Sequence, residues 1–110
     1  MEILFSSREL DKRSLYKHTR GQGTSLKDVD NGTIITPAEI VLYEDTNSRG
    51  DLVKIVSIVD ATGKHYVSGS PYFCDELLSI AQLMDDEPYK IMIVKKQSKA
   101  GRVFTTCELV

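Results

Sequence analysis

Residues 33–68 read TIITPAEIVLYEDTNSRGDLVKIVSIVDATGKHYVS, and this stretch decides the fold. Three runs rich in β-branched and aliphatic residues alternate with two clusters of turn residues, in the order 33–44, 46–51, 52–59, 60–63 and 64–68. Such runs joined by short polar turns predict a three-stranded antiparallel meander. Pro37 lies inside the first run and removes one donor from the ladder, so we expect a bulge or a sharp bend there.

The segment after the meander predicts one helix followed by a hairpin. Ser70 is a favoured N-cap residue, and Pro71 suits the first helical position because its missing N–H would lack a partner there in any case. Apolar residues then recur with helical spacing and form one stripe: Phe73, Leu77, Ile80, Ala81 and Met84. An acidic run before Pro88 ends this helix. Two further β-rich runs, 89–96 and 102–109, predict the closing hairpin.

The amino-terminal part of the chain predicts less regular structure. Residues 7–17 contain good helix formers behind Ser7, which can accept a backbone N–H as an N-cap, so we expect a short, mostly solvated and basic helix. The run Gly21–Ser25 is small and polar. It lacks the third glycine and the strand and helix context of a dinucleotide fingerprint, and we therefore favour a flexible loop over a nucleotide cradle.

The order strand, strand, strand, helix, strand, strand matches the OB barrel. We expect a mainly β protein with some helix: a five-stranded OB-fold-like barrel with a helix between strands 3 and 4 and a short amino-terminal helix. A chain of 110 residues with 41% hydrophobic residues has apolar material for one core, so we expect a single domain over residues 1–110. OB barrels bind oligonucleotides or oligosaccharides on strands 2 and 3 and on two loops, which here contain Arg49 and Lys99.

Several classes of function have no support in the sequence. No apolar run approaches the roughly 18 residues that cross a bilayer, and residues 1–7 lack the features of a secretion signal, so we expect a cytoplasmic protein without membrane contact. Cys74 and Cys107 have no zinc-binding spacing, and we expect free buried thiols, no metal and no cofactor. His18 and His65 have no recognisable nucleophile beside them in the sequence. The acidic run 85–87 is typical of a solvated helix end, and we expect no enzyme.

Charge is unevenly distributed along the chain, although the net charge is only -2. Residues 8–27 contain six basic residues against two acidic ones, and residues 88–110 contain five against one. The middle, residues 28–87, contains twelve acidic residues against three basic ones. Such segregation allows one side of a protein to bind a phosphate chain while the other side stays acidic. Charge alone is equally compatible with ordinary solvated loops.

A protein that binds single-stranded nucleic acid needs cations along a groove and flat rings on which bases stack. Lys64 and Tyr66 share one face of the third strand because side chains alternate along a strand. The candidate nucleic-acid-binding residues are Tyr43, Arg49, Lys54, Lys64, Tyr66, Lys95, Lys96, Lys99, Arg102 and Phe104. Each ring has a competing role in the core, and this alternative is stronger for Tyr43 and Phe104 than for Tyr66. We assign the three remaining tyrosines, Tyr16, Tyr72 and Tyr89, to packing at helix or strand ends.

The sequence also resembles a known family, the single-stranded DNA-binding proteins of small tailed Bacillus phages that copy linear genomes by protein-primed replication. The likeness runs from about Phe5 to the carboxyl end and is strongest in Gly21–Asp28, Asn31–Ile35, Ala38–Tyr43, Arg49–Asp51, Asp60–Tyr66 and Lys99–Phe104, taken in order. The resemblance implies that family tyrosines in contact with DNA fall on Tyr43 and Tyr66. A third family tyrosine is replaced by Arg49, so that loop would use charge or guanidinium stacking instead.

What the resemblance implies is a non-enzymatic protein that coats and protects the strand displaced during phage DNA replication, without sequence preference. Its partners would be single-stranded DNA and the phage replication machinery, in the cytoplasm of the infected bacterium, and the protein would be a monomer or a weak homo-oligomer. Two alternatives stay open. One is a phage protein-interaction module that docks on a host factor through the acidic middle region, and the other is an RNA or oligosaccharide binder on the same fold.

Overall fold

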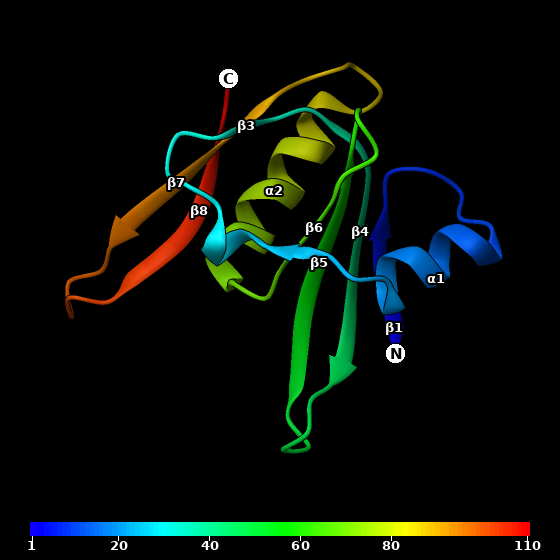
Figure 1. Cartoon of the computed structure of the whole chain (residues 1–110), viewed down its shortest axis with the longest axis horizontal. Helices are drawn as coiled ribbons and strands as arrows, with labels where there is room; N and C mark the ends of the chain where they lie inside the picture. The colour runs from blue at the N-terminus through cyan, green and yellow to red at the C-terminus, as the bar shows by residue number, and fades with distance from the viewer.

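Two β-sheets and two helices surround one hydrophobic core in the computed structural model, which describes residues 1–110 (Figure 1). The elements in chain order are β1 (Glu2–Ser6), α1 (Lys12–Arg20), β2 (Thr24–Ser25), the 3-10 turn η1 (Leu26–Asp28), β3 (Ile34–Ile35), β4 (Pro37–Thr46), β5 (Leu52–Asp60), β6 (His65–Ser68), α2 (Pro71–Met84), β7 (Ile91–Gln97) and β8 (Val103–Leu109). One sheet has the order β1-β4-β5-β6-β2 and the other β3-β7-β8. Neither helix is long and apolar enough to span a bilayer.

The predicted meander is confirmed, because β4, β5 and β6 pair in sequence and antiparallel. The first predicted strand is divided in two at Thr36: β3 pairs with β7, whereas β4 pairs with β5. The register shifts between Pro37 and Glu39, so the predicted irregularity at Pro37 is also confirmed. The bend carries the chain from one sheet into the other and thereby connects the two sheets.

Helix α2 begins and ends where the sequence predicts. The Ser70 hydroxyl accepts a hydrogen bond from the backbone N–H of Phe73 at 3.4 Å, and Pro71 occupies the first turn. The apolar stripe of α2 is buried against the strands, with Phe73 and Leu77 completely covered. Each large side chain removed from water in this way contributes about 1.5–3 kcal/mol, so α2 is a major element of the core.

The amino-terminal prediction is wrong in its details. Helix α1 begins at Lys12 and is capped by Asp11, whose carboxylate accepts from the backbone N–H of Ser14 at 2.7 Å. Ser7 has a different role, because its hydroxyl accepts from the backbone N–H of Ile40 in β4 at 2.8 Å. The residues before Ser7 form β1, which pairs with the edge of β4. The unpaired edge of a long strand needs hydrogen-bond partners, and this requirement takes precedence over local helix propensity.

The predicted five-stranded barrel is not confirmed, because the two sheets are not closed on one another. Closure requires β6 to pair with β8, but the free edge of β6 pairs in parallel with β2. A lysine bridges the gap instead: the Lys95 ammonium donates to the backbone oxygen of Leu26 at 2.7 Å and to the Thr105 hydroxyl at 3.0 Å. The fold is mainly β with two helices, and its element order is compatible with an open OB-like fold.

The run Gly21–Ser25 passes close to the end of α1 and to β6, and these contacts explain its glycines. A Cβ atom on Gly23 would lie 2.9 Å from a methyl carbon of Val67, and one on Gly21 would lie 2.4 Å from the backbone oxygen of Lys17. Only glycine allows such close approach. Packing therefore explains why glycines occur in this run. Most of the run is a loop, as predicted, but Thr24 and Ser25 form the short strand β2.

Candidate nucleic-acid interface

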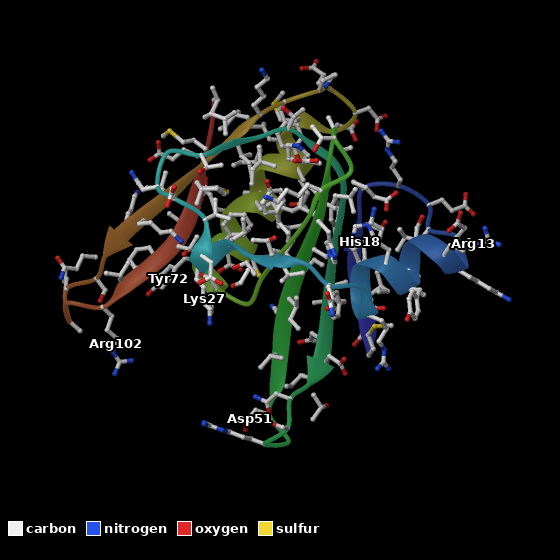
Figure 2. The ribbon with its side chains drawn as sticks, in the orientation of Figure 1. Arg13, His18, Lys27, Asp51, Tyr72 and Arg102 are labelled. Carbon is white, nitrogen blue, oxygen red and sulfur yellow. The ribbon has the colours of Figure 1, made fainter.

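Two hairpins extend from the body of the protein and diverge (Figure 1). We call residues 44–54 the β4–β5 arm and residues 95–104 the β7–β8 arm. A hollow lies near Gly69, just after β6, and consists of three adjoining clefts of about 420, 390 and 330 Å³, each of which Gly69 lines. Figure 2 shows Lys27 and Tyr72 between the arms, with Arg102 on one arm and Asp51 on the other.

The three clefts differ in charge. The one beside β8 is lined by Lys27 as its only charged residue, together with hydroxyl groups and Phe104. The one beside α2 has two carboxylates, Glu44 and Asp75, against Lys54. The third has no charged residue and contains three aliphatic side chains of β5 and β6. A phosphate chain therefore finds a favourable charge only in the cleft beside β8, which we call the Lys27 cleft.

The two arms also differ in charge. The β7–β8 arm has four cations and no carboxylate, whereas the β4–β5 arm has two cations and three carboxylates. The cations of the β7–β8 arm are not equivalent. Lys95 is committed to the bonds with Leu26 and Thr105, and burial lowers its pKa. The Lys96 ammonium lies 3.9 Å from a Glu108 carboxylate oxygen. Lys99 and Arg102 are exposed and have no ion-pair partner, so they are the cations most available to phosphate.

The structure places the other predicted cations away from this region or beside acids. Arg49 is exposed at the tip of the β4–β5 arm, in a turn where the Asn47 side chain accepts from the backbone N–H groups of Arg49 and Asp51. Lys54 lines the cleft that also contains two carboxylates. Lys64 lies beyond the far end of β5, about 30 Å from the arm tip along a nine-residue strand, with its ammonium 5.1 Å from the centre of the Tyr66 ring.

The tyrosines named by the family resemblance are both buried. Tyr43 is 5% exposed and Tyr66 is 6% exposed. Tyr66 belongs to the core that α2 covers, whereas Tyr43 lies on the opposite face of the five-stranded sheet and burial raises its pKa. Tyr43, Tyr66, Lys64 and Arg49 therefore do not meet on one exposed surface in this structure. Base stacking on either ring would require the protein to open locally, and their contact with DNA stays a prediction.

A different pair of rings lies at the surface. The Phe104 ring is half-buried, and its centre lies 4.3 Å from the centre of the Tyr72 ring, with 33° between the planes. We predicted that Tyr72 only packs at a helix or strand end, but 57% of this residue is exposed to solvent. Tyr72 lies in the first turn of α2, outside the buried stripe of that helix. An aromatic residue outside the stripe of an amphipathic helix is the sequence signal that could have identified it.

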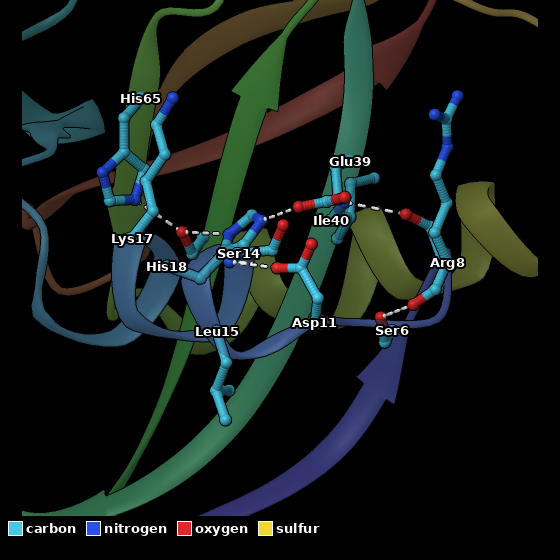
Figure 3. A network of polar contacts seen from close by, with 12 residues as sticks. Ser6, Arg8, Asp11, Ser14, Leu15, Lys17, His18, Glu39, Ile40 and His65 are labelled. Atoms are coloured by element: carbon cyan, nitrogen blue, oxygen red, sulfur yellow. Dashed lines mark hydrogen bonds and ion pairs between the residues drawn. The ribbon is translucent and has the colours of Figure 1, made fainter.

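A chain of buried polar groups lies on the face of the sheet that α1 covers (Figure 3). The two ring nitrogens of His18 lie 2.7 Å from the Ser57 hydroxyl and 2.5 Å from a Glu39 carboxylate oxygen, and the same hydroxyl lies 2.6 Å from His65. These residue types also occur in hydrolase triads. Ser57, however, is completely buried, so no substrate reaches its hydroxyl in this structure. The chain satisfies polar groups that would otherwise be buried without partners.

The remaining reactive groups are also buried. Burial raises the pKa of the Cys74 thiol to about 11 and that of Cys107 to about 12. Both thiols are free, as expected from the sequence. No three His, Cys, Asp or Glu side chains are grouped so that they could hold a metal ion. The groups exposed at the Lys27 cleft are therefore one cation, several hydroxyl groups and the Phe104 ring with its neighbour Tyr72.

Comparison with known families gives one match. The model of a family described as phage single-stranded DNA-binding protein matches residues 5–110, which include both arms and all three clefts. No curated protein and no solved structure gives a match. The match confirms the resemblance inferred from the sequence.

Proposed function

Because the chain belongs to the phage single-stranded DNA-binding protein family and therefore binds single-stranded DNA in phage replication, we propose that several copies coat the displaced strand with little sequence preference. The family match is the observation that carries this proposal. Coating would protect the strand from nucleases until its complement is made. The protein contributes binding and no catalytic step, in the cytoplasm of the infected bacterium.

We place the DNA in the hollow between the arms, along the Lys27 cleft. Lys27 lines this cleft, and Lys99 and Arg102 lie on the β7–β8 arm; all three are exposed and have no ion-pair partner. The element order is compatible with an OB-like fold, and such folds bind oligonucleotides between the two corresponding loops. Ammonium and guanidinium groups contact phosphates that every nucleotide carries, so this arrangement supports binding without sequence preference.

The proposal predicts a specific dependence on salt. Each phosphate neutralised on a single strand contributes about -0.7 to the slope of log affinity against log salt concentration. Three phosphate contacts per copy give a slope of about -2. Fluorescence anisotropy of labelled oligo-dT, titrated with protein at several salt concentrations, measures this slope. Absence of binding, or binding that does not respond to salt, would contradict the proposal.

Four further measurements test the separate parts of the proposal. Competition between unlabelled oligo-dT and oligo-rU tests for RNA binding, because a DNA-coating protein does not depend on a 2′-hydroxyl group. Nuclease digestion of a long single strand with increasing protein tests coating, and we expect full protection at saturation.

Sedimentation of the free protein tests the expected monomer or weak homo-oligomer. Sedimentation with the phage polymerase tests contact with the replication machinery.

A further inference from the structure

We propose that the paired rings of Tyr72 and Phe104 form a base-stacking site, in which an unpaired nucleobase lies on Tyr72 while Lys27 binds a neighbouring phosphate. The inference deepens the proposed function and rests on it, because it names the protein groups that contact a base. It assigns this contact to two surface rings, in addition to any role of the buried Tyr43 and Tyr66.

The geometry of the two rings suits this role. Their centres lie 4.3 Å apart and their planes are inclined by 33°, so Phe104 supports one side of the Tyr72 ring. More than half of the Tyr72 side chain stays exposed. A base placed on the open side would extend the stack by one ring. Stacking of this kind strengthens binding about 5- to 150-fold per base and tolerates every base, because each base has a π-face.

The rings are held in place by the surrounding structure. The Ser70 hydroxyl donates to the backbone oxygen of Thr105 at 2.8 Å and thereby connects the start of α2 to β8. Tyr72 lies two residues beyond Ser70 in α2, and Phe104 lies one residue before Thr105 in β8. Both rings are therefore positioned by rigid elements. A stacking surface that is already formed loses little conformational entropy when the ligand binds.

The Lys27 cleft lies directly beside the rings. Phe104 and Lys27 both line this cleft of about 420 Å³, together with the hydroxyl-bearing residues Ser25, Ser68, Ser70 and Thr105. This is a size typical of small-molecule sites. The lining contains a cation and several hydrogen-bonding groups but no carboxylate, so a nucleotide phosphate is not repelled. In this arrangement the base contacts Tyr72, and the neighbouring phosphate contacts Lys27 a short distance away.

Packing alone does not account for the pair. Phe73, Leu77 and Cys107 are buried between α2 and the strands, and they hold this part of the core without Tyr72. Tyr16 on α1 is the other strongly exposed tyrosine, at 68%, but it has no ring partner. Tyr16 is therefore a matched control: an exposed helical tyrosine for which we expect no stacking role.

The test compares two probes of equal length, oligo-dT and an abasic deoxyribose-phosphate oligomer. We expect Tyr72→Ala to weaken oligo-dT binding about 5- to 150-fold and to leave binding of the abasic oligomer unchanged. Tyr72→Phe should retain oligo-dT affinity because the ring is kept. Tyr16→Ala should behave as the wild type. Lys27→Ala should weaken binding of both probes and reduce the salt slope by about 0.7.

Tyrosine fluorescence gives a second readout, since the chain has five tyrosines and no tryptophan. We expect oligo-dT to quench the emission of the wild type, and we expect Tyr72→Phe to lose part of this quenching while it still binds. Circular dichroism of each variant verifies folding. Unchanged oligo-dT affinity in folded Tyr72→Ala, or equal losses for both probes, would overturn the inference. If the wild type itself fails to bind oligo-dT, the proposed function fails instead, and the two failures are thereby distinguished.

Discussion

The β4–β5 arm and the β7–β8 arm are built in the same way but carry different chemistry. Each is an antiparallel hairpin that turns through a glycine with φ of +84°, Gly50 in one and Gly101 in the other. The β4–β5 arm has three carboxylates, and Tyr43 at its base is buried. The β7–β8 arm has four cations and presents the Phe104 ring beside an open cleft.

This difference shows that backbone form does not decide where a polyanion binds. In an OB-like fold both corresponding loops are candidates for binding, so Arg49 and Lys99 are both candidate contacts. The charges of the two arms distinguish them, because Arg49 lies on an arm with three carboxylates and Lys99 lies on an arm with none. We infer that the β7–β8 arm binds DNA and that the β4–β5 arm, which contributes no buried residue to the core, only bounds the groove.

The largest expected effect concerns Tyr66, a buried ring on β6 in the body of the protein. Tyr66→Ala should lower the free energy of unfolding by about 3–5 kcal/mol, because it removes a buried aromatic side chain from the core. Urea denaturation measures this loss, and Tyr66→Phe should retain most of the stability. If Tyr66→Ala is as stable as the wild type but loses oligo-dT binding, the ring contacts DNA and our distinction between the arms fails.

The second prediction tests the β7–β8 arm directly. The double variant Lys99→Glu/Arg102→Glu should weaken oligo-dT binding about 100-fold at low salt and reduce the salt slope by about 1.4, because two phosphate contacts are lost and repulsion is added. Both side chains are exposed, so thermal stability should not change. Anisotropy titrations and thermal melts measure the two quantities.

The β4–β5 arm supplies the matched control for this charge reversal. Arg49→Glu should weaken binding only about 2- to 5-fold, since the residue lies among carboxylates. Asp51→Lys, at the same tip, should slightly strengthen binding at low salt. Equal losses from reversal on either arm would show that both arms bind the strand.

A third prediction tests whether the hollow between the arms is the path of the strand. A Cβ atom on Gly69 would find its nearest neighbour, the backbone oxygen of Lys54, 4.0 Å away, so a side chain fits there without steric conflict. Gly69→Glu should weaken oligo-dT binding about 10-fold by placing a carboxylate where the three clefts adjoin. Gly69→Ser serves as the control for size, and wild-type affinity in Gly69→Glu would move the path elsewhere.

The smallest effect concerns pH and the polar chain beneath α1. Burial lowers the pKa of His65 from its usual value of 6.5. The unfolded chain therefore takes up a proton at a higher pH than the folded protein, so acid favours unfolding. We expect the melting temperature to be constant above pH 6.5 as far as this group is concerned, and to fall as the pH drops below it. Melting curves between pH 5 and 8 test the direction, and a rise in stability on acidification would contradict it.

Much of the fold could be read from local patterns. The strands of the meander, the bend at Pro37 and the limits of α2 follow from alternation, helical spacing and the chemistry of proline and cap residues, which act over a few positions. The strand β1 and the parallel contact of β2 with β6 could not be read in this way. Both depend on which strand edges are left free after the sheet has formed, and that is a long-range property.

For the interface, the sequence determined the family, the segregation of charge and which side chains share a face of each strand. Alternation relates side chains only within one strand, and the pairing register of β4, β5 and β6 is what places Tyr43 and Tyr66 on opposite faces of the sheet. In this protein α1 covers one face and α2 the other, so both rings are buried. Only the tertiary structure brings Tyr72 onto Phe104, because α2 and β8 are distant in sequence and meet through packing.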